Sequence, residues 1–338
     1  MKVFLSCFLI AIPLIWGYRL YDLADLTKIS IRRDTSDATE MEYDLNHLEP
    51  KNHAALVSHG YVTSQGVEIF YRTFGHGDPL LIINGGPGMS SEGFIPLAQG
   101  LSKNRKSILF DQRGTGKSII DNPSEENVTM DLMVADMEAL RTHLRLENWV
   151  VMGHSFGGML ASYYTTKHPN RVAALILSSS GGVDMSLFEY LNINSRLTKE
   201  QQDSLIYWNK RIEEGDNSYQ ALLGRGRALA PAYLYDKTHV PVISKRLTQG
   251  NWDINGLVFA NMRAINFDCK ESLKSFSNPT LIVQGKQDIV DLSTANLAKE
   301  VLPQSKLVLL DQCGHYGWLE QRKEYFRILE QFLNSKTG

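Results

Sequence analysis

Residues 149–158 read Trp-Val-Val-Met-Gly-His-Ser-Phe-Gly-Gly, and this stretch decides the fold. Its apolar first half predicts a buried strand, and residues 159–164 after it predict a helix. A serine at the corner between them needs a backbone with positive φ and small residues two positions away on either side. Gly153 and Gly157 meet that need. Ser155 is therefore a candidate nucleophile, held at a helix N-terminus where developing negative charge is favoured.

Strand-like and helix-like segments alternate around this corner. Short apolar runs of the buried-strand type occur at 80–83, 108–110, 148–152, 172–177, 280–284 and 306–310. Residues 130–144 have helical spacing, and alternating residues at 57–63 and 67–73 predict an antiparallel hairpin. This order predicts an α/β fold whose mostly parallel sheet is covered by helices on both faces, with the hairpin at one edge.

Residues 183–277 interrupt the alternation, because they are rich in helix formers and aromatic residues and contain no convincing buried strand. They predict a helical insertion, here called the cap, that closes over the carboxyl edge of the sheet, where ligands bind in open α/β folds. The expected core then consists of residues 53–182 and 278–338.

The first residues differ from the rest of the chain. Lys2 precedes an apolar run from Val3 to Trp16, which is short for a membrane span but suits the core of a signal peptide. We expect residues 1–20 to be a signal peptide or an uncleaved anchor, and residues 21–52 to be a polar arm. The protein is then exported to a periplasmic or extracellular location, or anchored in a membrane.

Composition limits the partners of this chain. Of the 338 residues, 43% are hydrophobic and 21% are charged, and a formal charge of −2 gives no electrostatic case for binding nucleic acid. No histidine–carboxylate cluster has metal-ligand spacing, so neither a metal nor another cofactor is expected. Cys269 and Cys313 are the cysteines that follow the expected signal peptide. Two cysteines do not make a disulfide framework, so we expect unpaired thiols. Nothing in the sequence indicates the oligomeric state.

A serine nucleophile needs a base, and the base needs an acid to orient it. Asp288 follows the strand-like run at 280–284, and His315 follows the run at 306–310. Both loops belong to the same edge of the sheet as Ser155, and the order serine, acid, histidine is that of α/β hydrolases. Asp288 and His315 are therefore the candidate acid and base.

Other residues compete for these roles. Asp291 is a rival acid. His239 lies inside the cap, which is a poor place for a base that needs tight registry with the serine. His154 is adjacent to the nucleophile, but its side chain should point away from the serine hydroxyl.

An oxyanion hole is expected beside the nucleophile. Residues 84–88, Asn-Gly-Gly-Pro-Gly, follow a strand, and the glycines allow backbone N–H groups to approach a tetrahedral oxyanion. The expected donors are the amide of Gly86, with Gly85 as the alternative, and the amide of Phe156.

Residues 111–118 end in Gly-Lys-Ser, which resembles the end of a phosphate-binding loop. The first position of that loop must be glycine, and Asp111 occupies it, so nucleotide binding is not expected. We expect Asp111 and Arg113 to pair or hydrogen-bond, and so to brace the loops beside the site.

Four blocks together resemble the proline iminopeptidase family of α/β hydrolases. They are residues 84–88, 111–118, 153–158 and 314–315, and the Asp-Gln-Arg-Gly sequence of the second block is the most discriminating. The resemblance covers residues 55–182 and 278–335. It implies Ser155 as nucleophile, Asp288 as acid, His315 as base, and Gly86 and Phe156 as backbone donors.

The chain departs from the family in two places. Asn84 stands where the family usually has histidine. Family aminopeptidases hold the free α-ammonium group of the substrate with cap carboxylates, and no motif here selects among the acidic residues of the cap. The candidate substrate-binding residues are Glu189, Glu213, Glu214 and Asp216 in the cap, and Trp318 near the histidine.

Three functions are compatible with these residues. The first is a serine aminopeptidase that removes an N-terminal residue, proline preferred, from short peptides through an acyl-enzyme. The second is an esterase that uses the same chemistry on small acyl compounds. The third is a non-catalytic binding protein with this fold, although such proteins often lose a triad member and all three are present here.

Overall fold

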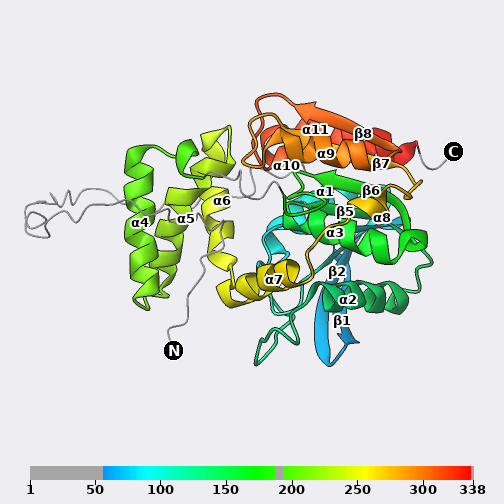
Figure 1. The fold of residues 1–338 in the computed structure, drawn as a ribbon, viewed down its shortest axis with the longest axis horizontal. Coiled ribbons are helices and arrows are strands. Elements are labelled where there is room, and N and C mark those ends of the chain that lie inside the picture. Colours follow the sequence, from blue (N-terminus) through cyan, green and yellow to red (C-terminus); the bar gives the residue numbers. More distant parts are fainter. Residues whose placement is uncertain (1–55, 187–192, 336–338) are drawn as a thin grey trace, which may run out of the picture. The chain divides into compact units, whose positions relative to one another are not determined.

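The computed structural model describes residues 56–186 and 193–335, which contain one eight-stranded sheet (Figure 1). The strands are β1 (Leu56–Ser64), β2 (Val67–Phe74), β3 (Asp78–Ile83), β4 (Arg105–Phe110), β5 (Trp149–His154), β6 (Val172–Ser178), β7 (Thr280–Gly285) and β8 (Ser305–Leu310). Their order in the sheet is β1-β2-β4-β3-β5-β6-β7-β8. β1 pairs antiparallel with β2 and β2 with β4, whereas all later pairs are parallel. The predicted α/β class and the antiparallel hairpin at one edge are confirmed.

Helices cover both faces of this sheet. The helices of the core are α1 (Ile95–Leu101), α2 (Met130–His143), α3 (Phe156–Lys167), α9 (Leu292–Val301), α10 (Gly317–Glu320) and α11 (Arg322–Asn334). Successive residues of β3 point to opposite faces. Leu81 and Ile83 pack in the hydrophobic cluster that includes α2, α3 and α9, whereas Leu80 and Ile82 pack in the cluster that includes α1 and α11. Burial on both faces explains why the inner strands are continuous apolar runs.

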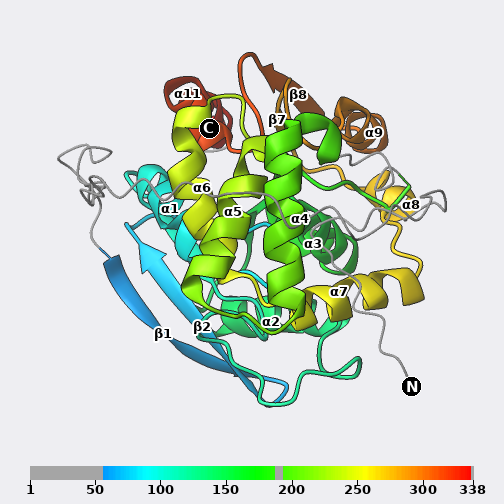
Figure 2. The same cartoon turned by 90° about the vertical axis from the view of Figure 1, so that its left-hand side faces the viewer.

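The described part of residues 183–277 contains helices and no β-strand. They are α4 (Lys199–Glu213), α5 (Tyr219–Tyr233), α6 (Val240–Arg246), α7 (Trp252–Ala264) and α8 (Lys270–Leu273). α5 packs between α4 and α6 (Figures 1 and 2). α5 and α6 contribute buried side chains, such as Leu229 and Ile243, to the cluster that includes α1 and α11, and α7 and α8 contribute others, such as Met262 and Leu273, to the cluster that includes α2 and α3. The segment therefore has an outer helix, α4, and an inner layer of helices, α5 to α8, that shares the hydrophobic clusters of the sheet.

Some sequence expectations concern residues outside this description. The expected leader (1–20) and polar arm (21–52) lie there. Among the helices that are described, none combines the length and the apolarity that a membrane crossing needs. Cys269 and Cys313 are buried and unpaired, as predicted, and burial raises the pKa of the Cys269 thiol to about 12.

Candidate active site

The turn from β5 to α3 has the strained geometry that its sequence predicts. Ser155 has φ 55° and ψ −123°. A Cβ on Gly153 would lie 2.1 Å from the carbonyl oxygen of Gly157, and a Cβ on Gly157 would lie 2.2 Å from that of Ile83. Only glycine allows these backbones to approach so closely, so the predicted positive φ and the need for small neighbours are confirmed.

Asp288 and His315 form a buried hydrogen-bonded pair. The Nδ1–H group of His315 donates to Asp288 Oδ1 at 2.7 Å, and the same oxygen accepts the backbone N–H of Val290 at 3.0 Å. Asp288 lies on the loop that follows β7, and His315 lies on the loop that follows β8. The rival acid, Asp291, caps α9 by accepting the N–H of Ser293 and does not line the pocket.

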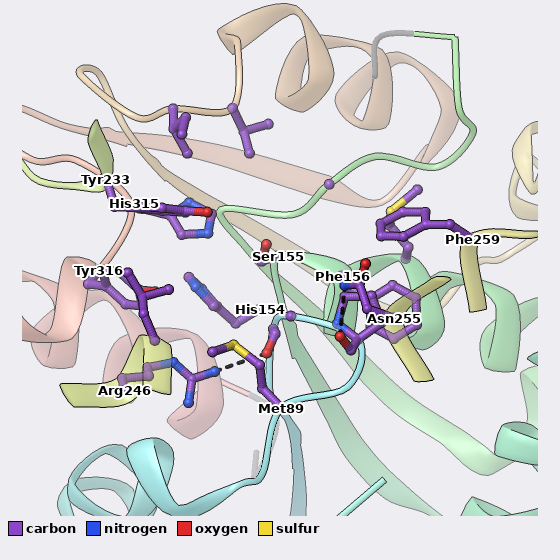
Figure 3. Close-up of a pocket in the computed structure, with 18 residues that line it drawn as sticks. Met89, His154, Ser155, Phe156, Tyr233, Arg246, Asn255, Phe259, His315 and Tyr316 are labelled. Carbon is purple, nitrogen blue, oxygen red and sulfur yellow. Dashed lines mark hydrogen bonds between the residues drawn. The ribbon is translucent and has the colours of Figure 1, made fainter. Parts of the chain in front are cut away.

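Ser155 and His315 line the same pocket. Figure 3 shows Ser155 beside the ring of His315. Within the described residues no hydrogen bond joins the two side chains. Such bonds are often long in free enzymes and shorten when substrate binds.

The loop after β3 presents its backbone to the nucleophile. Gly86 has φ 73°, and a Cβ on Gly85 would lie 2.6 Å from the Ser155 Cβ atom. Within the described chain, the N–H groups of Gly86 and Phe156 have no backbone or side-chain acceptor. Both residues line the pocket, so the arrangement can provide two N–H donors to an oxyanion.

Buried polar side chains hold this loop from the core side. Asn84 Nδ2 donates to the carbonyl oxygens of Gly85, at 3.2 Å, and Met89, at 3.0 Å. Gln112 Nε2 donates to the Asn84 carbonyl at 3.0 Å. Asp111 accepts two hydrogen bonds from Ser91, so it does brace the far end of the loop.

Arg113, the second expected brace, contacts a different element. Its guanidinium makes a bidentate ion pair with Asp136 of α2, at 2.8 and 2.6 Å. Arg113 therefore ties residues 111–118 to α2, which covers the sheet, and it does not pair with Asp111.

The walls of the pocket are mainly apolar and aromatic. The cavity encloses about 740 Å³, its open mouth included. Its apolar and aromatic side chains are Pro87, Met89, Phe156, Met159, Tyr233, Leu247, Phe259, Ile289, Val290 and Tyr316. Among the described lining residues there is no aspartate or glutamate, and the one guanidinium belongs to Arg246.

His154 lies beneath the catalytic pair as a neutral side chain. Its ring centroid is 4.6 Å from that of His315 and 4.7 Å from that of Trp318. Burial, together with the nearby charges of His315 and Arg246, holds the pKa of His154 well below its usual value of 6.5. A neutral ring contacts the catalytic histidine without competing for its proton.

Several predicted substrate contacts are not brought to the pocket. Trp318 is 1% exposed and packs against Phe94 and His154 beneath the site, so its large ring is part of the core. Glu213 and Glu214 are exposed at the end of α4, because that helix buries no side chain. Asp216 pairs with Arg211 at 2.6 Å. Glu189 lies outside the described residues.

Cap residues that no sequence pattern predicts contact the catalytic loops. The Tyr233 carbonyl accepts the backbone N–H of His315 at 2.8 Å. Arg246 Nη2 donates to the Gly85 carbonyl at 2.9 Å, and Asn255 Nδ2 donates to the Pro87 carbonyl at 2.9 Å. No motif marks these cap residues. Tyr316, which also lines the pocket, is marked only by its position next to His315. Nowhere in residues 56–186 and 193–335 do three or more His, Cys, Asp or Glu side chains cluster to hold a metal ion.

The chain is similar to several known proteins. Residues 78–321 match the family model of the alpha/beta hydrolase fold. The chain is 30% identical over 300 residues to a proline iminopeptidase of Lactobacillus helveticus, covering 81% of this chain and 97% of that protein. Among solved structures, it resembles a meta-cleavage product hydrolase from Pseudomonas fluorescens (TM-score 0.64, 22% identity, 82% and 97% of the two chains). It also resembles an esterase from Exiguobacterium antarcticum (TM-score 0.63, 19% identity, 82% and 100%). These two structures share its fold.

Proposed function

The chain belongs to the proline iminopeptidase family of α/β hydrolases, and we propose that it is a serine aminopeptidase that releases N-terminal residues, proline preferred, from short peptides. One observation carries the catalytic part of this proposal. Ser155, on a strained turn, shares a pocket with a histidine whose far nitrogen is bonded to a buried aspartate at 2.7 Å. Unpaired backbone N–H groups lie beside the serine, and together these groups are the parts that acyl transfer requires.

In the proposed mechanism Ser155 Oγ attacks the carbonyl carbon of the N-terminal residue while His315 Nε2 accepts the hydroxyl proton. Asp288 keeps the other ring nitrogen protonated and stabilises the imidazolium. The N–H groups of Gly86 and Phe156 bind the oxyanion of the tetrahedral intermediate. His315 then gives the proton to the leaving amine, and water hydrolyses the acyl-enzyme, with His315 again as the base.

The catalytic part is tested by replacing the nucleophile. Ser155→Ala should lose labelling by a fluorophosphonate and lower kcat by about 10⁴- to 10⁶-fold, as removal of a triad nucleophile does. Ser162→Ala is a matched control, because Ser162 is buried on the same helix and its hydroxyl has no hydrogen-bond partner in the described chain. Labelling that persists at another serine in Ser155→Ala would refute the proposed nucleophile.

A second candidate function, hydrolysis of small esters, is favoured by the charge of the pocket. An aminopeptidase must bind a positive α-ammonium group, yet the described wall carries Arg246 and no carboxylate. An acyl substrate without a free amine fits such a wall better. The two functions therefore differ in what the wall must recognise.

Proline β-naphthylamide and its N-acetyl form separate the two functions, with p-nitrophenyl acetate and butyrate as ester substrates. A charge-assisted contact is worth about 1.5–3 kcal/mol, so an aminopeptidase should prefer the free amine by roughly tenfold to a hundredfold in kcat/KM. An esterase should be indifferent to acetylation. Ester turnover without amide turnover would reject the aminopeptidase.

A further inference from the structure

Two side chains hold the carbonyl of Gly85, one from the core and one from the cap. Asn84 Nδ2 donates to this oxygen at 3.2 Å, and Arg246 Nη2, from the end of α6, donates at 2.9 Å. Figure 3 shows the Arg246 bond next to Met89 on the floor of the pocket. The carbonyl of Gly85 and the N–H of Gly86 belong to one planar trans peptide group, so they point in opposite directions. The side chains that hold the carbonyl therefore also set the direction of the N–H.

The surroundings of Arg246 are unusual for an arginine that only stabilises the fold. It is 6% exposed, and its Nε and Nη1 atoms have no hydrogen-bond partner in the described chain. Its guanidinium packs over the ring of Phe94 at 4.7 Å, and none of the ion pairs among the described residues includes it. Burying a charge is costly, and burial lowers the pKa of Arg246, although the nearby Tyr316 hydroxyl partly opposes this shift. This buried guanidinium lies next to the oxyanion loop.

We propose that Arg246 is a positioning residue for the oxyanion hole, which orients the Gly85–Gly86 peptide group and places a buried positive charge on the carbonyl side of that group. This inference rests on the proposed acyl-transfer function and adds a cap residue to its machinery. The bond from a charged donor polarises the peptide group and strengthens the Gly86 N–H as a donor. When the tetrahedral intermediate forms, the peptide group whose N–H binds its negative charge is already oriented and polarised.

Neighbouring contacts show that the same cap segment holds the rest of the loop. The N–H of Asn251 donates to the Gly88 carbonyl at 2.8 Å, and Asn255 holds the Pro87 carbonyl. Gly250 forms a β-bridge with Met89. Among these contacts, the Arg246 bond is the one made to the peptide group that bears the Gly86 N–H.

The test compares Arg246→Met, which keeps an unbranched apolar stem but removes charge and donors, with Arg246→Lys, which keeps the charge. Arg225→Met is the matched control, because Arg225 is also a buried cap arginine, stacks on Trp252 at 4.3 Å and does not line the pocket. For each variant, kcat and KM are measured on the substrate that the wild type turns over, with the midpoint of thermal unfolding.

Arg246→Met should lower kcat by about 10- to 100-fold with KM within twofold, a smaller loss than the 10²- to 10³-fold typical of deleting a whole oxyanion donor. Arg246→Lys should lie between Met and the wild type, and Arg225→Met should keep wild-type kcat. Three results would overturn the proposal: kcat unchanged in Arg246→Met, a rise in KM alone, or an equal loss of kcat in Arg225→Met.

If Arg246→Met does not fold, Arg246→Lys decides alone: a lower kcat at an unchanged unfolding midpoint supports the positioning role, and an unchanged kcat rejects it. Fluorophosphonate labelling of Ser155 in the wild type distinguishes failure of the role proposed for Arg246 from failure of the proposed function. A wild type that neither labels nor turns over any substrate refutes both, whereas a labelled wild type with an unaffected Arg246→Met refutes only the role of Arg246.

Discussion

Helices α4 and α5 are both 15 residues long and pack side by side, yet only α5 buries side chains. α4 exposes even large apolar residues, such as Ile206 at 64%. At the last residue of α5, the Tyr233 carbonyl accepts the N–H of His315. Just beyond the helix, the N–H groups of Tyr235 and Asp236 donate to the Glu320 carboxylate. The cap therefore contributes to the site through its inner layer, and the outer helix, α4, mainly covers that layer.

Among tests of this contrast between the two helices, the largest loss of activity should come from removing the contact between the inner layer and the loop of the catalytic acid. Arg196 donates to the carbonyls of Ala232, at 2.7 Å, and Asp288, at 3.0 Å, and also to that of Gln287. Arg196→Met should lower kcat by about 10²-fold, the loss expected when a catalytic group is misplaced by about 1 Å. Steady-state kinetics measure it.

Arg211→Met is the control for this prediction, since Arg211 is an exposed arginine on α4 that pairs with Asp216. Its kcat should stay within about twofold of the wild type, as for most surface changes. Equal losses in the two variants would erase the contrast between the layers.

A stability effect of intermediate size tests the packing of α5 on α6. A Cβ on Gly226 would lie 2.5 Å from the backbone oxygen of Ser244. Gly226→Val should therefore reduce the free energy of unfolding by about 1–3 kcal/mol, the usual cost of overpacking. Denaturant unfolding measures it.

Gly256→Ala, in α7, is the opposite case, because nothing lies within 4 Å of the added Cβ. Replacing an interior helical glycine by alanine should stabilise the protein by up to about 1 kcal/mol. If Gly226→Val proves as stable as the wild type, the inner layer is not tightly packed.

A smaller, pH-dependent effect is expected at Glu320. This carboxylate accepts backbone N–H groups from Tyr235, Asp236 and Gly314, and burial raises its pKa above the usual 4.5. The folded protein thus holds this proton more tightly than the unfolded chain does. The stabilisation is complete below pH 4.5 and is lost as the pH rises through the raised pKa.

Glu320→Gln cannot titrate, so the advantage of the wild type over this variant should shrink with rising pH. Urea unfolding of both proteins below pH 4.5 and at neutral pH measures the difference. A difference that is constant across this range, or that grows with pH, contradicts the assigned shift.

The smallest effect is expected on the outer helix. Glu213→Gln and Glu214→Gln should leave kcat/KM for proline β-naphthylamide within about twofold of wild type, because both side chains are exposed and neither lines the pocket. A tenfold loss in either variant would show that α4 reaches the substrate.

The core of the fold could be predicted from the sequence because inner strands are continuous apolar runs. β4 shows where this signal weakens, since it begins at Arg105, five residues before its apolar end. Arg105 is buried because its guanidinium donates to the Leu333 carbonyl at 2.7 Å. That partner is 228 positions away, and no local pattern indicates it.

The same reasoning separates the residues of the site. Ser155, Asp288 and His315 follow strands, so the rule that parallel strands end at one edge brought them together. Arg246 lies 161 positions from Gly85 on a helix without a motif, so its contact depends on how the cap docks. The charges of Glu213 and Glu214 suggested a role, but charge alone does not show which way a helix faces.

The order of the strands also has a consequence for synthesis. Ser155 follows β5, whereas Asp288 and His315 follow β7 and β8, which are made much later. A growing chain that ends at residue 285 therefore contains the nucleophile and the cap but neither acid nor base. We expect stalled chains of this length to be inert toward a fluorophosphonate, and reactivity to begin only after His315 has left the ribosome. Such a hydrolase stays inactive until its last strand and the histidine loop after it have been made.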